Sequence, residues 1–578
     1  MMDSVTWKIG GEAGFGIMAS GTMLARAFSR SGYHVFCTNE YPSLIRGGHN
    51  LITVRITTQP CESMVRDVHI LVALNKETVE LHKNELSDGS IVVYDPDNYQ
   101  WKPADFSKKV TLIELSFTQI VRQFEGEPVM RNTVAIGATM ALLGVDLSLL
   151  EVVIKDQFKK KGEKVISNNM AIAKSGYDFI KKNHASVTLM YLSKTEKKEP
   201  FLILNASEAV GIGAAQAGLK FAAIYPMTPI NALITFLADH EKQLKIVYFQ
   251  PEDEIAGINM AIGAAVGGVR SMVATSGGGY ALMVEGTALA GMMEVPLVID
   301  MGMRVGPATG MPTWTEQGEL QFIIHAGHGE FPRIVLAPGD GQEAYRLTID
   351  AFNLAEKYQT PVFILTDKYL NESQWCVPLS VFKGDVTIDR GKYVGNDTLS
   401  PGFKRYDLSA PDGISPRSRP GQKNGFYISN SYEHAEDGHM TEDALQRKQM
   451  VDKRMKKLEA IKKATVAPSV SGDPKADITF VTWGSTKGPV LEAVKMLKGK
   501  GKSARCIQYN WLFPFPAKQT KEILAGPGRI IDVEQNATGQ LASLIREHTG
   551  IEITEKILKY DGRPLYPEEI IEYINKKL

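Results

Sequence analysis

Four segments between residues 225 and 313 combine proline and glycine with hydroxyl, acidic or basic side chains, and each follows a short apolar run. They are Tyr225-Pro-Met-Thr-Pro229, Gln250-Pro-Glu-Asp-Glu254, Thr275-Ser-Gly-Gly-Gly-Tyr280 and Arg304-Val-Gly-Pro-Ala-Thr-Gly-Met-Pro-Thr313. Prolines fix the backbone around a hydroxyl group, and glycines let a ligand approach the main chain closely. Open α/β sheets bind ligands at the carboxyl ends of their strands. The four segments therefore predict one binding site at the edge of a sheet.

Glu254 is the side chain in these segments that could exchange protons with a bound molecule. It opens an expected helix over 254–268 that is rich in glycine and alanine, so its carboxyl could be desolvated. Each glycine in a helix costs about 1 kcal/mol relative to alanine, and we expect another helix or a cofactor to pack against this backbone. Structural roles stay open, because acids at a helix N-terminus also offset the macrodipole and Thr228 could be an ordinary helix cap.

A second glycine-rich turn lies near the N-terminus. Gly10-Gly-Glu-Ala-Gly-Phe-Gly16 stands between an expected strand and an expected helix and contains a variant of the dinucleotide fingerprint, with Glu40 about where a ribose-binding acid would lie. Such a turn also places a helix N-terminus near any phosphate, and Arg46-Gly-Gly-His-Asn50 adds a cation. NAD or FAD, another phosphorylated ligand and a plain structural turn all remain open.

The other clusters of polar residues do not predict a metal or disulfide site. Glu433-His-Ala-Glu-Asp-Gly-His439 lacks the same-face histidine spacing of a helical zinc motif, and we expect it on the surface of a charged arm. The chain has 4 cysteines, Cys37, Cys61, Cys376 and Cys506, and their wide spacing argues against a disulfide framework or an iron–sulfur cluster on this chain.

Composition excludes several classes of protein. The chain has 578 residues, of which 44% are hydrophobic and 22% charged, and its 65 Lys+Arg balance its 65 Asp+Glu. No apolar run is long enough to span a bilayer, and no net field would hold the chain to nucleic acid. The N-terminus lacks the features of a secretory signal, so we expect a cytoplasmic protein that acts on small molecules or protein partners.

Short β-branched runs alternate with helical stretches almost throughout, which predicts an α/β protein with mainly parallel sheets. Strands are expected near 5–9, 51–56, 69–74, 91–94, 221–224, 246–249, 272–275, 297–301, 334–336 and 362–365. Composition shifts predict an α/β domain over 1–190, a linker over 191–200, a second domain over 201–385, a charged arm or insertion over 386–470 and a third domain over 471–578.

The order and spacing of these motifs resemble those of the thiamine-diphosphate-dependent 2-oxoacid:ferredoxin oxidoreductases. The pyrimidine-binding domain of that family carries a Tyr-Pro-Ile-Thr-Pro loop, a Glu that opens a Gly/Ala helix, a Thr-Ser-Gly-Pro-Gly turn and a Gly-Pro-Ser-Thr-Gly-x-Pro-Thr segment. The first 190 residues are similar to its gamma domain, and residues 476–578, with Val533-Glu-Gln-Asn536, to its transketolase C-terminal-type domain. Gly413-Ile-Ser-Pro-Arg417 resembles the arm of its 2-oxoglutarate-type subunits. Five residues depart from the family pattern: Phe15, Gly278, Tyr280, Ala308 and Trp314.

The resemblance implies a role for each candidate residue. Glu254 would be catalytic, through a hydrogen bond to the aminopyrimidine of thiamine diphosphate, while Thr228 and Arg304 would bind the 2-oxo-carboxylate of the substrate. The cofactor-binding set would be Tyr225, Pro226, Thr228, Glu254, Thr275, Ser276 and Gly277, and the possible CoA-binding set Gly11, Gly14, Gly16 and Arg46. Gly339-Asp-Gly341 with Asn371 imitates the Mg²⁺-diphosphate motif, but Asn371 stands beyond the end of its strand, so we expect no metal site there.

The resemblance also implies partners and a reaction. The chain would be a fused gamma–alpha subunit that converts a 2-oxoacid, with 2-oxoglutarate favoured, and CoA into acyl-CoA, CO₂ and reduced ferredoxin. A separate beta subunit would hold the Mg²⁺-diphosphate and a [4Fe-4S] cluster, and the assembly would be a two-fold (αβ)₂ heterotetramer that is active only when complete. A non-catalytic scaffold subunit and an ordinary NAD- or FAD-dependent oxidoreductase are the alternatives.

Overall fold

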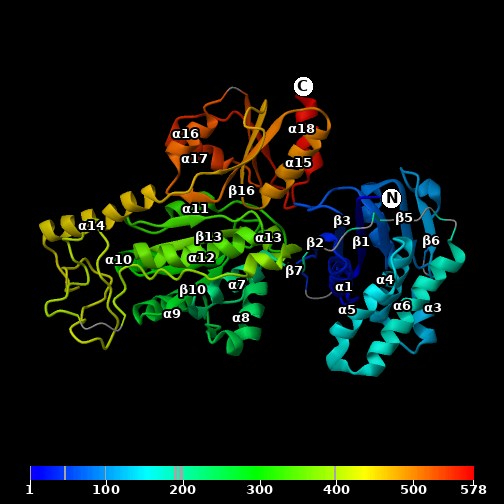
Figure 1. Cartoon of the computed structure of the whole chain (residues 1–578), viewed down its shortest axis with the longest axis horizontal. Coiled ribbons are helices and arrows are strands. Elements are labelled where there is room, and N and C mark those ends of the chain that lie inside the picture. The colour runs from blue at the N-terminus through cyan, green and yellow to red at the C-terminus, as the bar shows by residue number, and fades with distance from the viewer. Residues whose placement is uncertain are drawn as a thin grey trace. The chain divides into compact units, whose positions relative to one another are not determined.

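The structure is a computed structural model that describes residues 2–577 apart from 45, 46, 98, 186, 188–191, 194, 196–198, 396–398 and 527. The chain forms two compact units (Figure 1). Unit 1 comprises Met1–Leu204, Ser373–Lys383 and Tyr566–Glu568, and unit 2 comprises Asn205–Glu372, Gly384–Leu565 and Glu569–Leu578.

Unit 1 is built around a mixed sheet with the strand order β6-β5-β4-β1-β3-β2-β14-β7. Its strands are β1 (Ser4–Glu12), β2 (His34–Glu40), β3 (His49–Thr57), β4 (Val68–Ala73), β5 (Leu86–Tyr94), β6 (Thr111–Glu114), β7 (Phe201–Leu204) and β14 (Gln374–Pro378). β1, β4, β5 and β6 run parallel, whereas β3 is antiparallel to both β1 and β2. β14 is antiparallel to both β2 and β7, so two segments beyond residue 200 extend the first sheet.

Helices cover this sheet on both faces. They are α1 (Ile17–Arg30), α2 (Lys76–His82), α3 (Phe117–Gln123), α4 (Arg131–Leu142), α5 (Ser148–Phe158) and α6 (Glu163–Asn183). Alternate residues of β4 enter different cores, Ile70 and Val72 one and Leu71 and Ala73 the other, as expected of a strand buried on both sides. α4 and α6 pack at close range because Gly137 has no Cβ that would strike the main chain of α6.

Unit 2 contains a second sheet with the order β18-β12-β13-β11-β10-β8-β9. Its strands are β8 (Leu219–Ala223), β9 (Val247–Phe249), β10 (Arg270–Thr275), β11 (Leu297–Met303), β12 (Ile334–Leu336), β13 (Pro361–Asp367) and β18 (Trp511–Phe513). All pairs are parallel except β12 with β18. The associated helices are α7 (Ala206–Gln216), α8 (Asn231–Leu244), α9 (Glu254–Val266), α10 (Gly277–Met292), α11 (Leu320–His325), α12 (Gly341–Tyr358) and α13 (Lys368–Glu372).

A third sheet, also in unit 2, has the order β15-β17-β16-β19-β20. Its strands are β15 (Ser469–Gly472), β16 (Ile478–Trp483), β17 (Ala504–Tyr509), β19 (Arg529–Glu534) and β20 (Glu555–Leu558), and the helices around it are α15 (Lys487–Gly499), α16 (Ala517–Leu524), α17 (Gln540–Thr549) and α18 (Pro567–Lys576). All of its strand pairs are parallel except β15 with β17.

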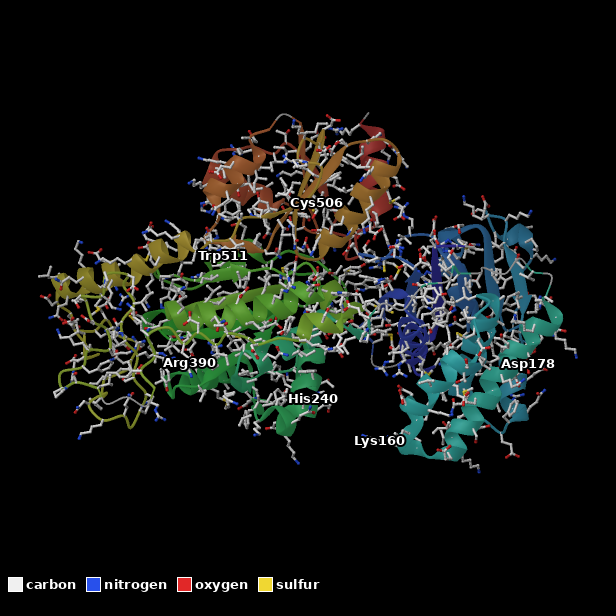
Figure 2. All side chains as sticks on the ribbon, in the orientation of Figure 1. Lys160, Asp178, His240, Arg390, Cys506 and Trp511 are labelled. Atoms are coloured by element: carbon white, nitrogen blue, oxygen red, sulfur yellow. The ribbon has the colours of Figure 1, made fainter. Side chains whose placement is uncertain are left out.

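The second and third sheets share one core. Ile299 and Phe363 of the second sheet belong to the same buried cluster as Trp483 and Tyr509 of the third. Figure 2 labels Cys506 within the third sheet and Trp511 on β18, the strand that joins the edge of the second sheet. The two sheets therefore form one body, and loops of either sheet can contribute to one site.

The polar segment after residue 383 differs from the solvated arm that the sequence predicted. It leads through an irregular stretch to α14 (Ala444–Lys463). Lys453 and Lys457 of this helix are buried, with exposed fractions of 2% and 1%, and both pair with buried Glu294, at 2.8 and 2.5 Å. The charges are buried because each has a partner of opposite sign, which amino-acid composition does not reveal.

The same segment corrects the interpretation of the Glu433–His439 cluster as a surface feature. His434 is 1% exposed, while His439 lies at the surface. Glu433 accepts two hydrogen bonds from Arg454, 3.0 and 2.8 Å long. Burial opposes ionisation of this carboxyl, but Arg454 and Arg447 beside it lower its pKa to about 2, well below the usual range. The cluster anchors the segment.

Two mainly parallel sheets and one mixed sheet, all with associated helices, confirm the predicted α/β class, although four of the seven strand pairs of the first sheet are antiparallel. The boundaries proposed for the domains, near residues 190, 200, 385 and 470, stay predictions. Over the residues that the structure describes, no helix has the length and apolar character needed to cross a membrane.

Candidate active site

The four segments singled out in the sequence lie at one edge of the second sheet. They follow β8, β9, β10 and β11, which are neighbours in the order β11-β10-β8-β9 and run parallel. Their carboxyl ends therefore meet at the same edge, as in other open α/β sheets that bind ligands.

Arg304 and Thr228 are in direct contact, although they are 76 positions apart. The Nη1 atom of Arg304 donates to the main-chain oxygen of Thr228 at 2.9 Å. Arg304 is half-buried, and this burial lowers the pKa of its guanidinium, an effect that nearby Glu319 opposes. The remaining donors of the guanidinium are available for an anion.

Glu254 and Thr275 both present buried oxygen atoms without a hydrogen-bond partner. Glu254 begins α9 behind an Asp253 cap, whose side chain accepts from the main-chain nitrogen of Ala256 at 2.7 Å. Glu254 is 3% exposed and Thr275 is fully buried, yet Glu254 Oε1 and Thr275 Oγ1 have no partner within the described residues. Buried polar atoms are almost always hydrogen-bonded, so these two mark a place where a polar ligand group fits.

Gly279 lies against both of these oxygens. A Cβ atom on Gly279 would lie 2.5 Å from Glu254 Oε1 and would also strike Thr275 Oγ1. The glycine-rich start of α10 therefore lets the main chain approach the two orphaned oxygens. The sequence predicted close packing against the glycines of α9, whereas the glycine at this contact belongs to α10.

The other predicted cofactor-binding residues lie around the same edge. Ser276 is fully buried, and its hydroxyl donates to the sulfur of Met227. Tyr225 is half-buried and Pro226 exposed, so they lie at the mouth of the site. Gly277 is the first residue of α10. Direct contacts join Arg304 to Thr228 and bring Glu254 and Thr275 together at Gly279. The roles proposed for the cofactor-binding residues stay predictions.

Glu319 also lies at this edge of the sheet, beside the start of α10, although the sequence analysis did not identify it. Its Oε1 atom would be 2.7 Å from a Cβ on Gly277, and its Oε2 atom is buried with no hydrogen-bond partner in the described part of the chain. Burial, with a contribution from Glu316, raises its pKa to about 8. The sequence showed only an acid soon after the Arg304–Thr313 segment. The loop that brings this acid close to α10 has no periodic pattern from which the contact could be predicted.

The residues that imitate a Mg²⁺ motif make other interactions, although Asn371 Oδ1 is buried and has no hydrogen-bond partner among the described residues. Asp340 caps α12 by accepting from the main-chain nitrogen of Glu343, and its second oxygen pairs with Lys487. Asn371 instead donates to the Thr366 hydroxyl at 2.9 Å. No group of three or more candidate metal-ligating side chains is found among the residues that the structure covers.

The glycine loop of unit 1 joins β1 to α1. Gly14 and Gly16 have φ values of 91° and 70°, which side chains rarely adopt, and Gly11 is the next-to-last residue of β1. Gly16 precedes α1 without a side-chain cap, so the first N–H groups of that helix are open to an anion. Arg46, predicted to lie beside this loop, falls outside the described residues.

The same unit does not have the strand arrangement of a dinucleotide-binding fold. In that fold the strand after the first helix is the neighbour of the first strand. Here β2, which carries Glu40, pairs with β3 and β14, and β3 separates it from β1. Glu40 is therefore not placed as a ribose-binding acid.

Comparisons with known proteins cover nearly the whole chain. Residues 212–453 match the family described as pyruvate flavodoxin/ferredoxin oxidoreductase, thiamine diphosphate-binding. Residues 6–179 match pyruvate ferredoxin/flavodoxin oxidoreductase, and residues 476–570 match pyruvate:ferredoxin oxidoreductase core domain II.

Individual relatives agree with these matches. The chain is 35% identical to the 2-oxoacid:ferredoxin oxidoreductase subunit alpha of Saccharolobus solfataricus, over 99% of this chain and 97% of that one. It is 30% identical to the 2-oxoglutarate synthase subunit KorA of Archaeoglobus fulgidus, over 65% of this chain and 99% of that one.

A solved structure shows the same fold throughout. The 2-oxoglutarate:ferredoxin oxidoreductase of Magnetococcus marinus, solved with 2-oxoglutarate, coenzyme A and succinyl-CoA bound, is similar with a TM-score of 0.91 and 31% identity, over 100% of each chain. The chain therefore belongs to the family of thiamine-diphosphate-dependent 2-oxoacid:ferredoxin oxidoreductase alpha subunits.

Proposed function

We propose that this chain, with a beta subunit, catalyses the CoA-dependent oxidative decarboxylation of a 2-oxoacid, 2-oxoglutarate being favoured, with ferredoxin as the electron acceptor. The observation that carries the proposal is the pair of buried, unpartnered oxygens of Glu254 and Thr275 against Gly279. These groups fit the polar edge of an aminopyrimidine ring. Thiamine diphosphate, when bound, would supply a carbon of its thiazolium ring that attacks the 2-oxo group, and the thiazolium ring would accept the electrons of the breaking bond.

Glu254 is the proposed proton-transfer residue. Its carboxyl is buried and held at the N-terminus of α9, where the unpartnered Oε1 atom would meet a nitrogen of the aminopyrimidine ring without competition from water. A carboxyl positioned in this way exchanges a proton with the ring and so controls the ring's tautomer. Tyr225, Pro226, Thr228, Ser276 and Gly277 would complete the surface around the ring.

Thr228 and Arg304 are the proposed binding residues for the 2-oxo-carboxylate. Arg304 is already oriented by its bond to the Thr228 carbonyl, so its planar fork loses little freedom when a carboxylate binds. The role of the Thr228 hydroxyl is to orient the 2-oxo group. A fixed carboxylate is needed because the bond between the carboxylate and the 2-oxo carbon, which breaks, must be aligned with the thiazolium ring that accepts its electrons.

Preference for 2-oxoglutarate requires a second cation for the distal carboxylate. Arg563, which follows β20, is exposed, and its guanidinium carbon lies 3.3 Å from the ring centroid of Trp314. Trp314 is on the same loop as Arg304, and its main-chain oxygen accepts from Val305 at 3.2 Å. Trp314 stands where related subunits often carry arginine, so Arg563 is our candidate for the missing charge. The names of the Archaeoglobus and Magnetococcus proteins also support this preference.

Unit 1 is proposed to hold CoA through Gly11, Gly14, Gly16 and Arg46. A cavity of about 350 Å³ lies beside Gly16 and is lined by Asn132, Lys161 and the apolar side chains of Met23, Met130 and Phe158 among others. Asn132 is 4% exposed, and its Oδ1 atom has no hydrogen-bond partner among the residues that the structure describes. A helix N-terminus, a lysine and an apolar wall suit a phosphorylated ligand with a long organic body.

The partner is proposed to be a beta subunit that carries Mg²⁺, the diphosphate site and the [4Fe-4S] cluster, in an (αβ)₂ assembly. Large apolar side chains are exposed on the elements that frame the site: Val247 (52%) and Phe249 (47%) on β9, Ile255 (48%) and Met260 (38%) on α9, and Leu282 (51%) on α10. β9 is an edge strand. Apolar surface on an edge strand normally marks an interface.

Expression with and without the beta subunit tests the proposal. We expect the assembled complex to contain thiamine and iron and to reduce viologen dyes with a 2-oxoacid and CoA, while the chain alone is inactive. Substantial turnover by the chain alone would contradict the shared site and return Asp340 and Asn371 to consideration as metal ligands. A yellow flavin spectrum without iron would favour an ordinary flavin enzyme instead.

A further inference from the structure

Four polar side chains of unit 1 form a series of hydrogen bonds that none of the roles above uses. Lys8 comes from β1, His49 from the start of β3, and His82 and Glu85 from the end of α2 and the turn after it. Glu85 Oε2 accepts from Lys8, Glu85 Oε1 lies 2.7 Å from His82 Nδ1, and His82 Nε2 lies 3.0 Å from His49 Nε2. The series ends at His49 Nδ1, which is buried and has no hydrogen-bond partner among the described residues.

The partners determine which nitrogen of each ring carries a hydrogen. Burial opposes ionisation of Glu85, but its hydrogen bond from His82 and the charge of Lys8 lower its pKa to about 2, so it is a carboxylate that only accepts. His82 Nδ1 therefore carries a hydrogen. The Lys8 ammonium, 3.5 Å from the same Nδ1, opposes a positive charge on this ring, which leaves His82 Nε2 as an acceptor. His49 Nε2 then donates to it, and His49 Nδ1 is an acceptor.

The His49 ring is uncharged at neutral pH. Burial, the neighbouring ring of His82 and the charge of Lys8 lower its pKa to about 4, although Glu85 acts in the opposite direction. A neutral imidazole with an available acceptor nitrogen binds N–H, O–H or S–H groups and does not attract an anion. His49 Nδ1 therefore suits a ligand group that can donate a hydrogen bond.

His49 lies where the glycine loop of unit 1 begins. It pairs with Glu12, the last residue of β1, and a Cβ on Gly10 would lie 2.8 Å from His49 Cε1, so the missing side chain makes room for the ring. The Thr78 hydroxyl, which lies against the same glycine, donates to Asn75 Oδ1 at 2.6 Å and so is not used for His49. The acceptor nitrogen is thus next to the loop proposed to bind CoA.

We propose that His49 is a further ligand-binding residue of unit 1, whose Nδ1 atom accepts a hydrogen bond from the pantetheine arm of CoA, either from an amide N–H or from the thiol. His82 and Glu85 are positioning residues that hold the His49 ring in the required tautomer. The inference rests on the proposed function, because it takes the glycine loop as part of the CoA site. A 2-oxoacid anion has no such donor, so His49 should affect the binding of CoA and not that of the 2-oxoacid.

The first test needs no ligand. In Glu85→Gln, Lys8 can only donate and therefore selects the amide oxygen, which turns the amide NH₂ toward His82 Nδ1. His82 would then carry its hydrogen on Nε2 and His49 on Nδ1, so the acceptor becomes a donor. Nitrogen-15 NMR of the full chain with labelled histidine rings distinguishes the two tautomers, and His49→Asn assigns the His49 signals. Unchanged tautomers in Glu85→Gln would overturn the inference.

The second test is calorimetric titration of the assembled complex with CoA, without 2-oxoacid or ferredoxin. His49→Leu and Glu85→Gln should each weaken CoA binding by about 5–100-fold, the effect of leaving one buried hydrogen-bonding group without its partner. His49→Asn places an amide oxygen where Nδ1 stood and should recover most of the affinity that His49→Leu loses. With His49→Asn present, Glu85→Gln should have no further effect, which a merely structural role of Glu85 would not produce.

Glu80→Gln is the matched control, because Glu80 is an exposed residue of α2 that pairs with Lys76, and it should leave CoA binding unchanged. A loss shared by CoA and desulfo-CoA would assign the donor to an amide, and a loss limited to CoA would assign it to the thiol. Equal CoA affinity of His49→Leu and the unmodified complex would overturn the inference. If the proposed function itself is wrong, the unmodified complex will not bind CoA, which distinguishes the two failures.

Discussion

Gly279→Ala is a substitution whose effect follows directly from the geometry of the site. An added Cβ would lie 2.5 Å from Glu254 Oε1, whereas ordinary carbon–oxygen contacts are about 3.5 Å, so the Glu254 carboxyl must move by about 1 Å. A misplacement of about 1 Å in a catalytic group can cost about 10²-fold in rate. We therefore expect kcat of the assembled complex to fall by about 10²-fold.

Gly278→Ala is the matched control, because Gly278 is the adjacent residue of the same helix. A Cβ there would meet only the main-chain oxygen of Ala308, at 3.9 Å. Both substitutions gain about the same helix propensity, up to about 1 kcal/mol, so the difference between them reports the clash with Glu254 and Thr275. The assay is 2-oxoacid-dependent viologen reduction, with thermal unfolding to verify that both variants are folded. Turnover of Gly279→Ala within a few-fold of Gly278→Ala would refute the placement of Glu254 against the aminopyrimidine ring.

Four further predictions address the other parts of the molecule. Glu254→Gln should lower kcat about 10²–10⁴-fold, the range for a positioned proton-transfer group, and near-normal turnover would show that another carboxylate does this work. Arg304→Lys should raise KM for every 2-oxoacid tested, because lysine keeps the charge but loses the fork, whereas Arg563→Gln should raise KM for 2-oxoglutarate and leave that for pyruvate unchanged. Glu294→Gln should lower the free energy of unfolding by roughly 3–5 kcal/mol in a denaturant titration, because two buried lysines lose their partner; a loss below 1 kcal/mol would contradict this.

The sequence was informative wherever the physical signal was local. Each strand expected before residue 385, such as 51–56 and 297–301, overlaps an observed strand and extends at most one residue beyond it, because a short β-branched run between glycines or polar turns is a local pattern. The candidate site followed from the same signals, since four parallel strands must end at the same edge once the sheet forms. The order of Tyr225–Pro229, Glu254, Thr275 and Arg304 along the chain was therefore enough to predict that they meet.

The sequence was uninformative where a contact joins distant segments. Glu319 reaches Gly277 through an irregular loop, and Lys453 reaches Glu294 across 159 positions. Neither pair leaves a periodic pattern, because a single side-chain contact constrains only its own two residues. The same reason explains the charged residues of α14, whose composition is typical of a solvated helix although part of one face is buried.

The extension of the first sheet by β14 and β7 has a practical consequence for dividing the protein into fragments. β2 is an interior strand because Gln374 and Trp375 of β14 pair with Cys37 and Phe36. A fragment that stops near residue 190 would lose both added strands and leave β2 as a bare edge, able to pair with the same edge of another copy. Such a fragment should self-associate, so ligand-binding measurements on unit 1 are better made on the full chain, or on a design that grafts residues 373–383 back onto the sheet.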